Sequence, residues 1–257
     1  MRLQIAAISL LFLAACASPP ATTGIVESEP SLLLLGEQHD DPSHHEAESV
    51  MVRALAGRGV LAALALEMAD SGASTAGMRT EASEDEVRRA LRWDSEGWPW
   101  ADYAPAVMAA VAAGVPVVGA NLPRERLRAA MTDATLDTLL PGPAVKAQQQ
   151  AIRTGHCGLL PEGQIAPMTR VQIARDRSMA STLARLVVPG KTVLLIAGGG
   201  HVSADIGVPR HLPPHLISRS VQLPAPLTPG RDYCAQLRRQ WNAGSTPGGQ
   251  LDGRSDR

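Results

Sequence analysis

Residues 32–41 read LLLLGEQHDD, an apolar run that reaches a glycine and then places a carboxylate, Glu37, and an imidazole, His39, two residues apart. A short apolar run of this kind predicts a buried strand. In α/β sheets, ligands and chemistry lie just beyond the carboxyl ends of the strands. Residues 193–201, VLLIAGGGH, repeat the layout and end in His201. The repetition predicts a functional site at the carboxyl edge of a sheet.

Apolar runs alternate with helical patterns along the chain, which predicts a mostly parallel sheet covered by helices on both faces. The expected fold class is therefore α/β, a single three-layer domain. Residues 124–188 hold no strand-like run and predict a helical insertion before the fourth strand, with its longest helix at 168–188. The expected strands span residues 32–35, 61–66, 115–120, 192–197 and 216–223.

A helix is expected directly after the first strand. Asp41 can cap it, Pro42 suits its first turn, and Gly57 can end it. His44 and His45, in its first turn, are expected to be solvated or capping residues. The expected buried face consists of Ala47, Val50, Met51, Ala54 and Leu55, which share one side at helical spacing.

The N-terminus has the pattern of a bacterial lipoprotein. A basic start and an apolar run too short to span a bilayer predict a signal peptide over residues 1–15. Residues 13–16, LAAC, then match a lipobox, which makes Cys16 the acylated (palmitate-bearing) N-terminus of the mature chain. The alternative is an ordinary signal peptide with a chance cysteine. No aspartate follows Cys16 directly, which favours the outer membrane.

The rest of the chain divides simply. Residues 16–30 are expected to be a tether, 31–243 the α/β domain, and 244–257 a disordered tail. A net charge of −1 gives no electrostatic footprint for nucleic acid. If Cys16 carries lipid, Cys157 and Cys234 remain as an even pair in an oxidising compartment and predict a disulfide. The alternative is a reactive thiol at Cys157 beside His156.

Four groups at strand ends could carry chemistry: Glu37, His39, Glu67 and His201. A histidine beside two carboxylates can act as a general base in hydrolysis. The same groups could hold a divalent metal on His39, His201 and Glu67. The third possibility is a buried ion-pair network, since carboxylates at the ends of apolar strands need partners.

Aromatic residues gather in one short stretch, which suggests either core packing or the wall of an apolar pocket. A tyrosine there draws notice because a phenolate can ligate ferric haem. The stretch contains Trp93, Trp98, Trp100 and Tyr103.

Several motifs together resemble the ChaN-like haem-binding lipoproteins, which belong to a wider group with erythromycin esterases and TraB/TIKI-type hydrolases. They cover most of the mature chain in order. The matching pieces are GEQHD at 36–40, ALEM at 65–68, WADYAP at 100–105, GVPVVGANLPR at 114–124, GHCGLLP at 155–161, Gln172 with Arg175-Asp176, GH at 200–201 and GVPRHL at 207–212.

The resemblance implies an α/β fold and haem as cofactor, with iron held by a tyrosine and two haems stacked between two molecules of a homodimer. The role implied is haem or iron acquisition by a lipid-anchored protein at the outer membrane of a Gram-negative bacterium, with an outer-membrane haem receptor as partner. Tyr103 is the expected ligand, because Tyr233 adjoins the predicted disulfide and looks structural. The remaining candidates are His156 or His211 as substitute ligands and Arg124, Arg175 and Arg210 for the haem propionates.

Two hypotheses follow. The first is a haem-binding envelope lipoprotein with no chemistry of its own. The second is a hydrolase, of esterase or metal-dependent peptidase type, that uses Glu37, His39, Glu67 and His201. The wider group places catalytic or metal-binding residues in motifs that map onto Glu37, His39 and His201.

Overall fold

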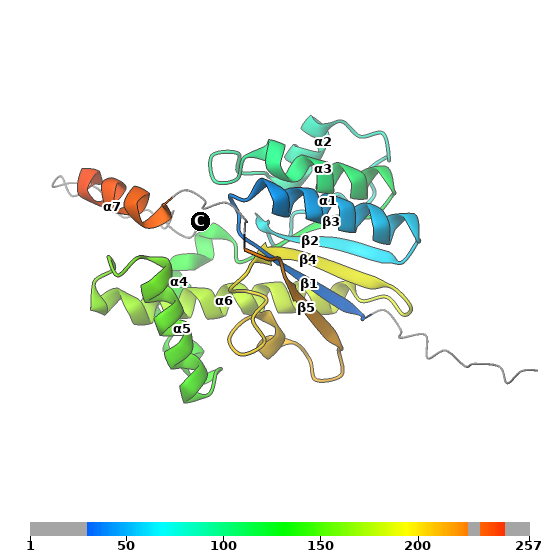
Figure 1. Cartoon of the computed structure of the whole chain (residues 1–257). Helices are drawn as coiled ribbons and strands as arrows, with labels where there is room; N and C mark the ends of the chain where they lie inside the picture. Colours follow the sequence, from blue (N-terminus) through cyan, green and yellow to red (C-terminus); the bar gives the residue numbers. More distant parts are fainter. Residues whose placement is uncertain (1–29, 226–231, 245–257) are drawn as a thin grey trace, which may run out of the picture.

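Five parallel strands form one sheet in the order β3-β2-β4-β1-β5 (Figure 1). The computed structural model describes residues 30–225 and 232–244, so the predicted signal peptide, the predicted lipidation site Cys16, and most of the predicted tether and tail lie outside the described residues. The strands are β1 (Leu32–Glu37), β2 (Leu61–Asp70), β3 (Val117–Asn121), β4 (Thr192–Gly198) and β5 (Ser218–Gln222).

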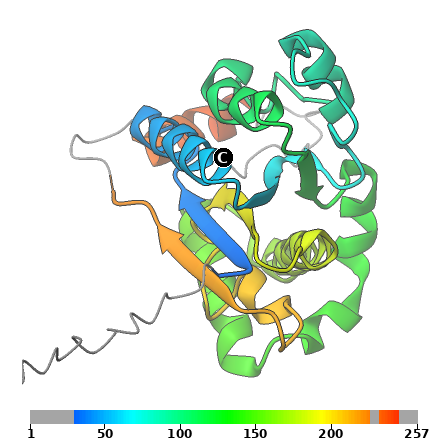
Figure 2. The ribbon, with the colours of Figure 1, turned by 90° about the vertical axis from the view of Figure 1, so that its right-hand side faces the viewer.

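Helices cover both faces of this sheet, which confirms the three-layer α/β prediction. Figures 1 and 2 show α1 and α3 on one side and α6 on the other. The α-helices are α1 (Pro42–Gly57), α2 (Glu84–Leu91), α3 (Trp100–Ala112), α4 (Leu127–Thr132), α5 (Gly142–Gly155), α6 (Glu162–Leu186) and α7 (Tyr233–Gly244). The 3₁₀ helices are η1 (Arg124–Arg126), η2 (Ala134–Thr138) and η3 (Val208–His211).

The apolar run of β1 supplies both halves of the core because side chains alternate across a strand. Leu33 and Leu35 pack under α1 and α3, whereas Leu32 and Leu34 pack with Met179 of α6. Both faces of the strand are buried, as a central parallel strand requires. This burial explains why the sequence shows an unbroken apolar run instead of an alternating pattern.

The five predicted strands are confirmed, although several bounds differ: β1 continues to Glu37, and β5 is shorter than predicted, Ser218–Gln222. β2 continues to Asp70, four residues beyond its predicted end, so Glu67 lies inside the strand. β3 begins two residues later than predicted, after Pro116. The backbones of β2 and β3 lie very close together at Gly119. A Cβ at this position would lie 2.1 Å from the backbone oxygen of Asp70. Only glycine therefore allows this approach.

The buried face of α1 differs from the prediction. Asp41 caps the helix as expected, and its side chain accepts a hydrogen bond from the backbone of Ser43. Val50, however, is exposed, and the helix buries a face that carries His45, Glu48, Val52 and Leu55 together with His44 and Ser49. Of the predicted face, Leu55 is buried, whereas Val50 and Ala54 are exposed. The difference arises because the prediction considered only apolar side chains, and this helix faces a carboxylate at the end of β1.

The helical insertion before the fourth strand is confirmed, since residues 124–188 are all described and contain no strand. Its longest helix, α6, begins at Glu162 and not at Met168. Pro167 lies in the second turn of α6. No helix within the described residues combines the length and the hydropathy of a membrane span.

The predicted disulfide between Cys157 and Cys234 is present, with the two Cα atoms 5.6 Å apart. It joins the loop after α5 to the first turn of α7. Figure 1 shows α7 projecting from the body on the side where the strands end. The two cysteines are 77 residues apart in the chain, so the bond closes a long loop.

Candidate functional site

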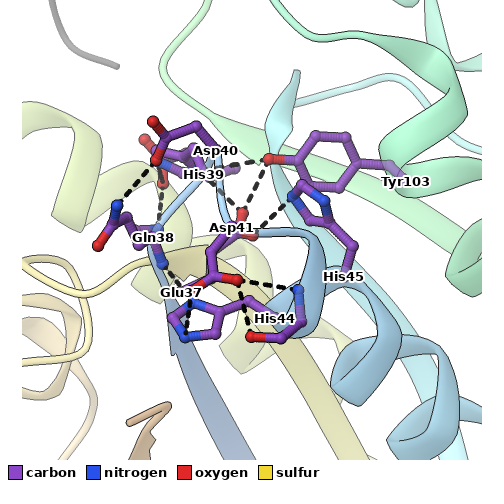
Figure 3. Close-up of polar contacts among 11 residues, drawn as sticks. Glu37, Gln38, His39, Asp40, Asp41, His44, His45 and Tyr103 are labelled. Carbon is purple, nitrogen blue, oxygen red and sulfur yellow. Dashed lines mark hydrogen bonds and ion pairs between the residues drawn. The ribbon is translucent and has the colours of Figure 1, made fainter. Parts of the chain in front are cut away.

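Polar side chains gather around the carboxylate of Glu37, the last residue of β1 (Figure 3). His39 Nδ1 donates to Glu37 Oε1 over 2.8 Å, and the hydroxyl of Tyr103 donates to the same oxygen over 3.0 Å. His45 Nε2 forms an ion pair with Glu37 Oε2 at 3.4 Å. The buried carboxylate is thus surrounded by donors from the β1–α1 loop, α1 and α3.

A second carboxylate, Glu67 of β2, links this group to the end of β4. Its Oε1 lies 3.2 Å from His201 Nε2, and its Oε2 lies 3.6 Å from His39 Nε2. The backbone N–H of Gly198 donates to Oε2 over 2.7 Å. Beyond it, His201 Nδ1 donates to Asp176 Oδ1 of α6 over 2.6 Å. The structure therefore brings the four predicted strand-end residues together.

The strand-end cluster, as we name it, has eight members, three of which the sequence did not assign to this site. His45 and Glu48 come from α1, and Asp176 comes from α6. Helical spacing is the signal that could have identified them. On α1, His45 and Glu48 share one buried face with Val52 and Leu55. On α6, Asp176 shares one buried face with Met179 and Leu183. The members are Glu37, His39, His45, Glu48, Glu67, Tyr103, Asp176 and His201.

Neighbouring charges determine the protonation of the two central carboxylates. Burial would raise the pKa of Glu37, but hydrogen bonds from His39 and His45 outweigh it and hold that pKa well below its usual range. Burial would also raise the pKa of Glu67, but the charges of His201 and His39 outweigh it and lower that pKa. Both carboxylates are ionised at neutral pH.

The imidazoles respond in the opposite direction. Burial would lower the pKa of His201, but Glu67 and Asp176 raise it to about 10. The pKa of His39 is also raised, because Glu67 and Glu37 outweigh burial. Burial and the adjacent Glu37 raise the pKa of Glu48, so its carboxyl group stays protonated. Each ionised carboxylate of the pair Glu37 and Glu67 thus lies against an imidazole whose protonated form it favours.

His39 is the most exposed member of the cluster. The side chain of His39 is 14% exposed, whereas the other seven members are buried. Trp98 lies beside it, with ring centroids 4.8 Å apart.

The aromatic stretch packs as core. Trp93 and Trp100 meet edge to face at 5.0 Å, and Tyr103 lies 4.9 Å from the ring of His45. Tyr103 is 1% exposed, and burial together with Glu37 raises the pKa of its phenol above the ordinary value. This placement argues against Tyr103 as the haem ligand, because the phenolate form is disfavoured and no surface of the ring is open to a porphyrin.

The other residues predicted to contact haem come from separate elements. His156 is buried at the end of α5, where its Nδ1 donates to the carbonyl of Ile152 over 2.9 Å. Arg124 of η1 and Arg210 of η3 are exposed. Tyr233, expected to be structural, is partly exposed in the first turn of α7.

Two further histidines, His44 and His211, lie outside the strand-end cluster. His44 is buried, not solvated; its Nδ1 accepts from the backbone of Gln38 and its Nε2 donates to the carbonyl of Pro224, each over 2.8 Å. It therefore ties the β1–α1 loop to the segment after β5. His211 is half-buried, and burial lowers its pKa to about 4.

A metal centre finds no support within residues 30–225 and 232–244. No group of three or more His, Cys, Asp or Glu side chains there is arranged to hold a metal ion. In the strand-end cluster, His39, Glu67 and His201 pair with one another. The geometry of these three residues therefore does not support the alternative of a divalent metal site.

Comparison with known proteins agrees with the fold and with the motifs. Residues 28–212 match the sequence model of a family described as haem-binding uptake, Tiki superfamily, ChaN. A solved structure described as cofacial haem binding to ChaN of Campylobacter jejuni has a TM-score of 0.62 and 26% sequence identity, covering 78% of this chain and 84% of that one. No curated protein matches the sequence significantly.

Proposed function

Since the chain belongs to the ChaN family of haem-binding uptake proteins, we propose that it binds haem at the bacterial envelope and serves haem or iron acquisition. The family match covers residues 28–212, and the fold is similar to that of the Campylobacter jejuni protein. Haem is accordingly the cofactor that we assign to this chain.

The iron ligand that we propose is Tyr233. The chain has two tyrosines, and the deciding observation is that Tyr103 is buried with its hydroxyl bonded to Glu37, whereas Tyr233 is partly exposed. A tyrosine phenolate is an established ligand of ferric haem. The family match ends before α7, so this assignment rests on the geometry of this chain.

The composition of α7 suits a porphyrin. Tyr233 and Trp241 lie on the same side of α7 and are both partly exposed, so aromatic surface is available beside the phenol, whereas Leu237 between them is buried. Arg238 and Arg239 are exposed on the same helix and can pair with the haem propionates. Bound haem supplies the iron, and these residues hold and orient it.

Two copies of the chain are proposed to meet through haem. The solved relative from Campylobacter jejuni is described as binding haem cofacially. A haem held on a projecting helix leaves one porphyrin face uncovered, and stacking against a second haem removes that face from water. The dimer is therefore expected to form on haem binding.

The envelope location is also a proposal. The lipobox at 13–16 supports a lipid on Cys16, an outer-membrane anchor and proximity to a haem receptor. The disulfide between Cys157 and Cys234 agrees with an oxidising compartment.

A haem titration of the full chain tests the proposal, with Tyr233→Phe and Tyr103→Phe as matched variants. We expect saturation at one haem per chain with a high-spin ferric tyrosinate spectrum. Tyr233→Phe should abolish that spectrum, and Tyr103→Phe should retain it. No saturable binding would overturn the proposal, and loss of the spectrum in Tyr103→Phe alone would return the ligand to Tyr103. Sedimentation with and without haem tests the dimer.

A second candidate function is hydrolysis at His39. The specific observation is that Glu37 holds Nδ1 of a partly exposed imidazole, the arrangement that orients a general acid or base. The test is turnover of a p-nitrophenyl ester by the full chain, by His39→Ala and by the exposed-site control His215→Ala. Activity lost only in His39→Ala would support hydrolysis; equal activity in all three, or none, would exclude this ester chemistry.

A further inference from the structure

The disulfide lies beside the proposed haem ligand. Cys234 follows Tyr233 directly in the first turn of α7, and its partner Cys157 follows His156 at the end of α5. The bond therefore connects the backbone next to Tyr233 to the main body of the protein.

Other attachments of α7 are few among the described residues. Of the side chains at 232–242, only Leu237 is fully buried. The carboxylate of Asp232 accepts from the backbone of Ala235 over 2.8 Å, which caps the helix without joining it to the body. Tyr233 and Trp241 make further contacts of their own. A helix of 12 residues is marginally stable by itself, so its position depends on what fastens it.

The body presents Cys157 in an unusual backbone conformation. Its φ is 55°, in the left-handed region, and Gly158 follows with a φ of 69°. Left-handed backbone is disfavoured for a residue with a side chain, and it persists where the surroundings enforce it. Here Cys157 N–H donates to Thr154 O over 2.9 Å and Gly158 N–H to Arg153 O over 2.8 Å. The loop thus holds one half-cystine in place, and α7 attaches to it.

We propose that the Cys157–Cys234 disulfide is a redox-controlled tether that positions Tyr233 for haem, so that its reduction by a dithiol releases haem. This inference rests on the proposed function. Both half-cystines are partly exposed, so a dithiol can reach them. The reductant transfers two electrons and two protons, the S–S bond breaks, two thiols form, and the reductant becomes a disulfide.

The physical reason is preorganisation. With the bond closed, the phenol is held at one place, and haem binding does not have to order α7. With the bond open, α7 loses its covalent link across the 77-residue separation, and ordering it lowers the affinity. Cys157 and Cys234 are thus positioning residues, because they act through Tyr233 and do not touch the iron.

The test compares haem binding by the oxidised full chain with binding by a Cys157→Ser/Cys234→Ser variant. The double change avoids a free thiol that could itself ligate iron. We expect the haem dissociation constant to rise at least tenfold and the tyrosinate bands to weaken, while the far-UV circular dichroism at 25 °C loses no more helical signal than the 12 residues of α7 account for. A dissociation constant within twofold of the oxidised chain, with the same spectrum, would overturn the inference.

A chemical route provides the second measurement. The oxidised chain is reduced with a phosphine, and the reductant is removed before haem is added because phosphines and thiols both ligate haem iron; reoxidation should restore the original affinity. Collapse of the whole fold on reduction would also overturn the inference, because the bond would then hold more than α7.

Failure of the proposed function gives a different result. If the oxidised chain binds no haem, haem binding itself fails. If it binds haem with an affinity that neither Tyr233→Phe nor loss of the disulfide changes, haem binding stands and the tether fails.

Discussion

The strand-end cluster and the helix α7 both carry residues suited to chemistry, and the protein holds them in opposite ways. In the cluster, carboxylates and imidazoles pair with one another, and even the most exposed side chain, that of His39, is only 14% exposed. On α7, Tyr233, Arg238 and Arg239 reach the surface, and a disulfide fastens the helix.

This difference teaches that a gathering of ionisable residues does not by itself identify a binding site. The cluster satisfies its charges internally, which is what a buried ion-pair network needs in order to be stable. A ligand for a large cofactor needs the reverse: an accessible donor on a rigid support. Four variants or conditions test this contrast, beginning with the largest effect.

Removal of the central carboxylate should have the greatest effect. Glu67→Gln leaves the imidazoles of His39 and His201 without the charge that pairs them, so we expect a loss of about 3–5 kcal/mol in the free energy of unfolding. Urea denaturation measures it, with the exposed Glu46→Gln on α1 as the control. A loss below about 1 kcal/mol would show that the cluster is not a structural network.

Alkaline pH should weaken the fold next. Because the folded pKa of His201 is raised to about 10, its contribution to stability is complete below the unfolded pKa of about 6.5 and is lost as pH rises toward 10. Between pH 7 and 9 we expect a decline of about 1.4 kcal/mol per pH unit from this group. Asp176→Asn removes one of the carboxylates that raise this pKa and should flatten the slope in denaturation curves recorded across that range. An unchanged slope would mean that Asp176 does not raise the pKa of His201.

A smaller loss is expected from Tyr103→Phe. The change deletes a hydrogen bond to the ionised Glu37, which is worth about 2 kcal/mol in a buried site. Tyr233→Phe should cost less stability, because that ring is partly exposed. Thermal unfolding of the two variants compares the two regions directly, and a larger loss from Tyr233→Phe would reverse the contrast.

The smallest effect should come from Arg153→Ala. Arg153 pairs with Glu162 near Cys157, but both side chains lie at the surface, where water and salt screen the interaction. We expect no measurable change in the denaturation midpoint or in haem affinity. A clear change in haem affinity would show that this ion pair, as well as the disulfide, helps to position α7.

Much of the site was predictable because its anchor points lie at the ends of apolar runs. Glu37, His39, Glu67 and His201 are all placed by strands that the sequence marks clearly. His45 and Glu48 were not predicted because α1 buries a partly polar face. The spacing of apolar side chains alone indicated a different face of this helix. Asp176 was missed because its partner, His201, is 25 residues away in another element.

The sequence alone determined the five strands, the helical insertion and the cysteine pair, because apolar runs and cysteine number are properties of the chain that need no partner. The tertiary structure decided which polar groups meet and which are accessible. It buried Tyr103 against Glu37 and left Tyr233 partly exposed on α7. The reason is that burial depends on what lies opposite a side chain, and that neighbour usually comes from a distant part of the sequence.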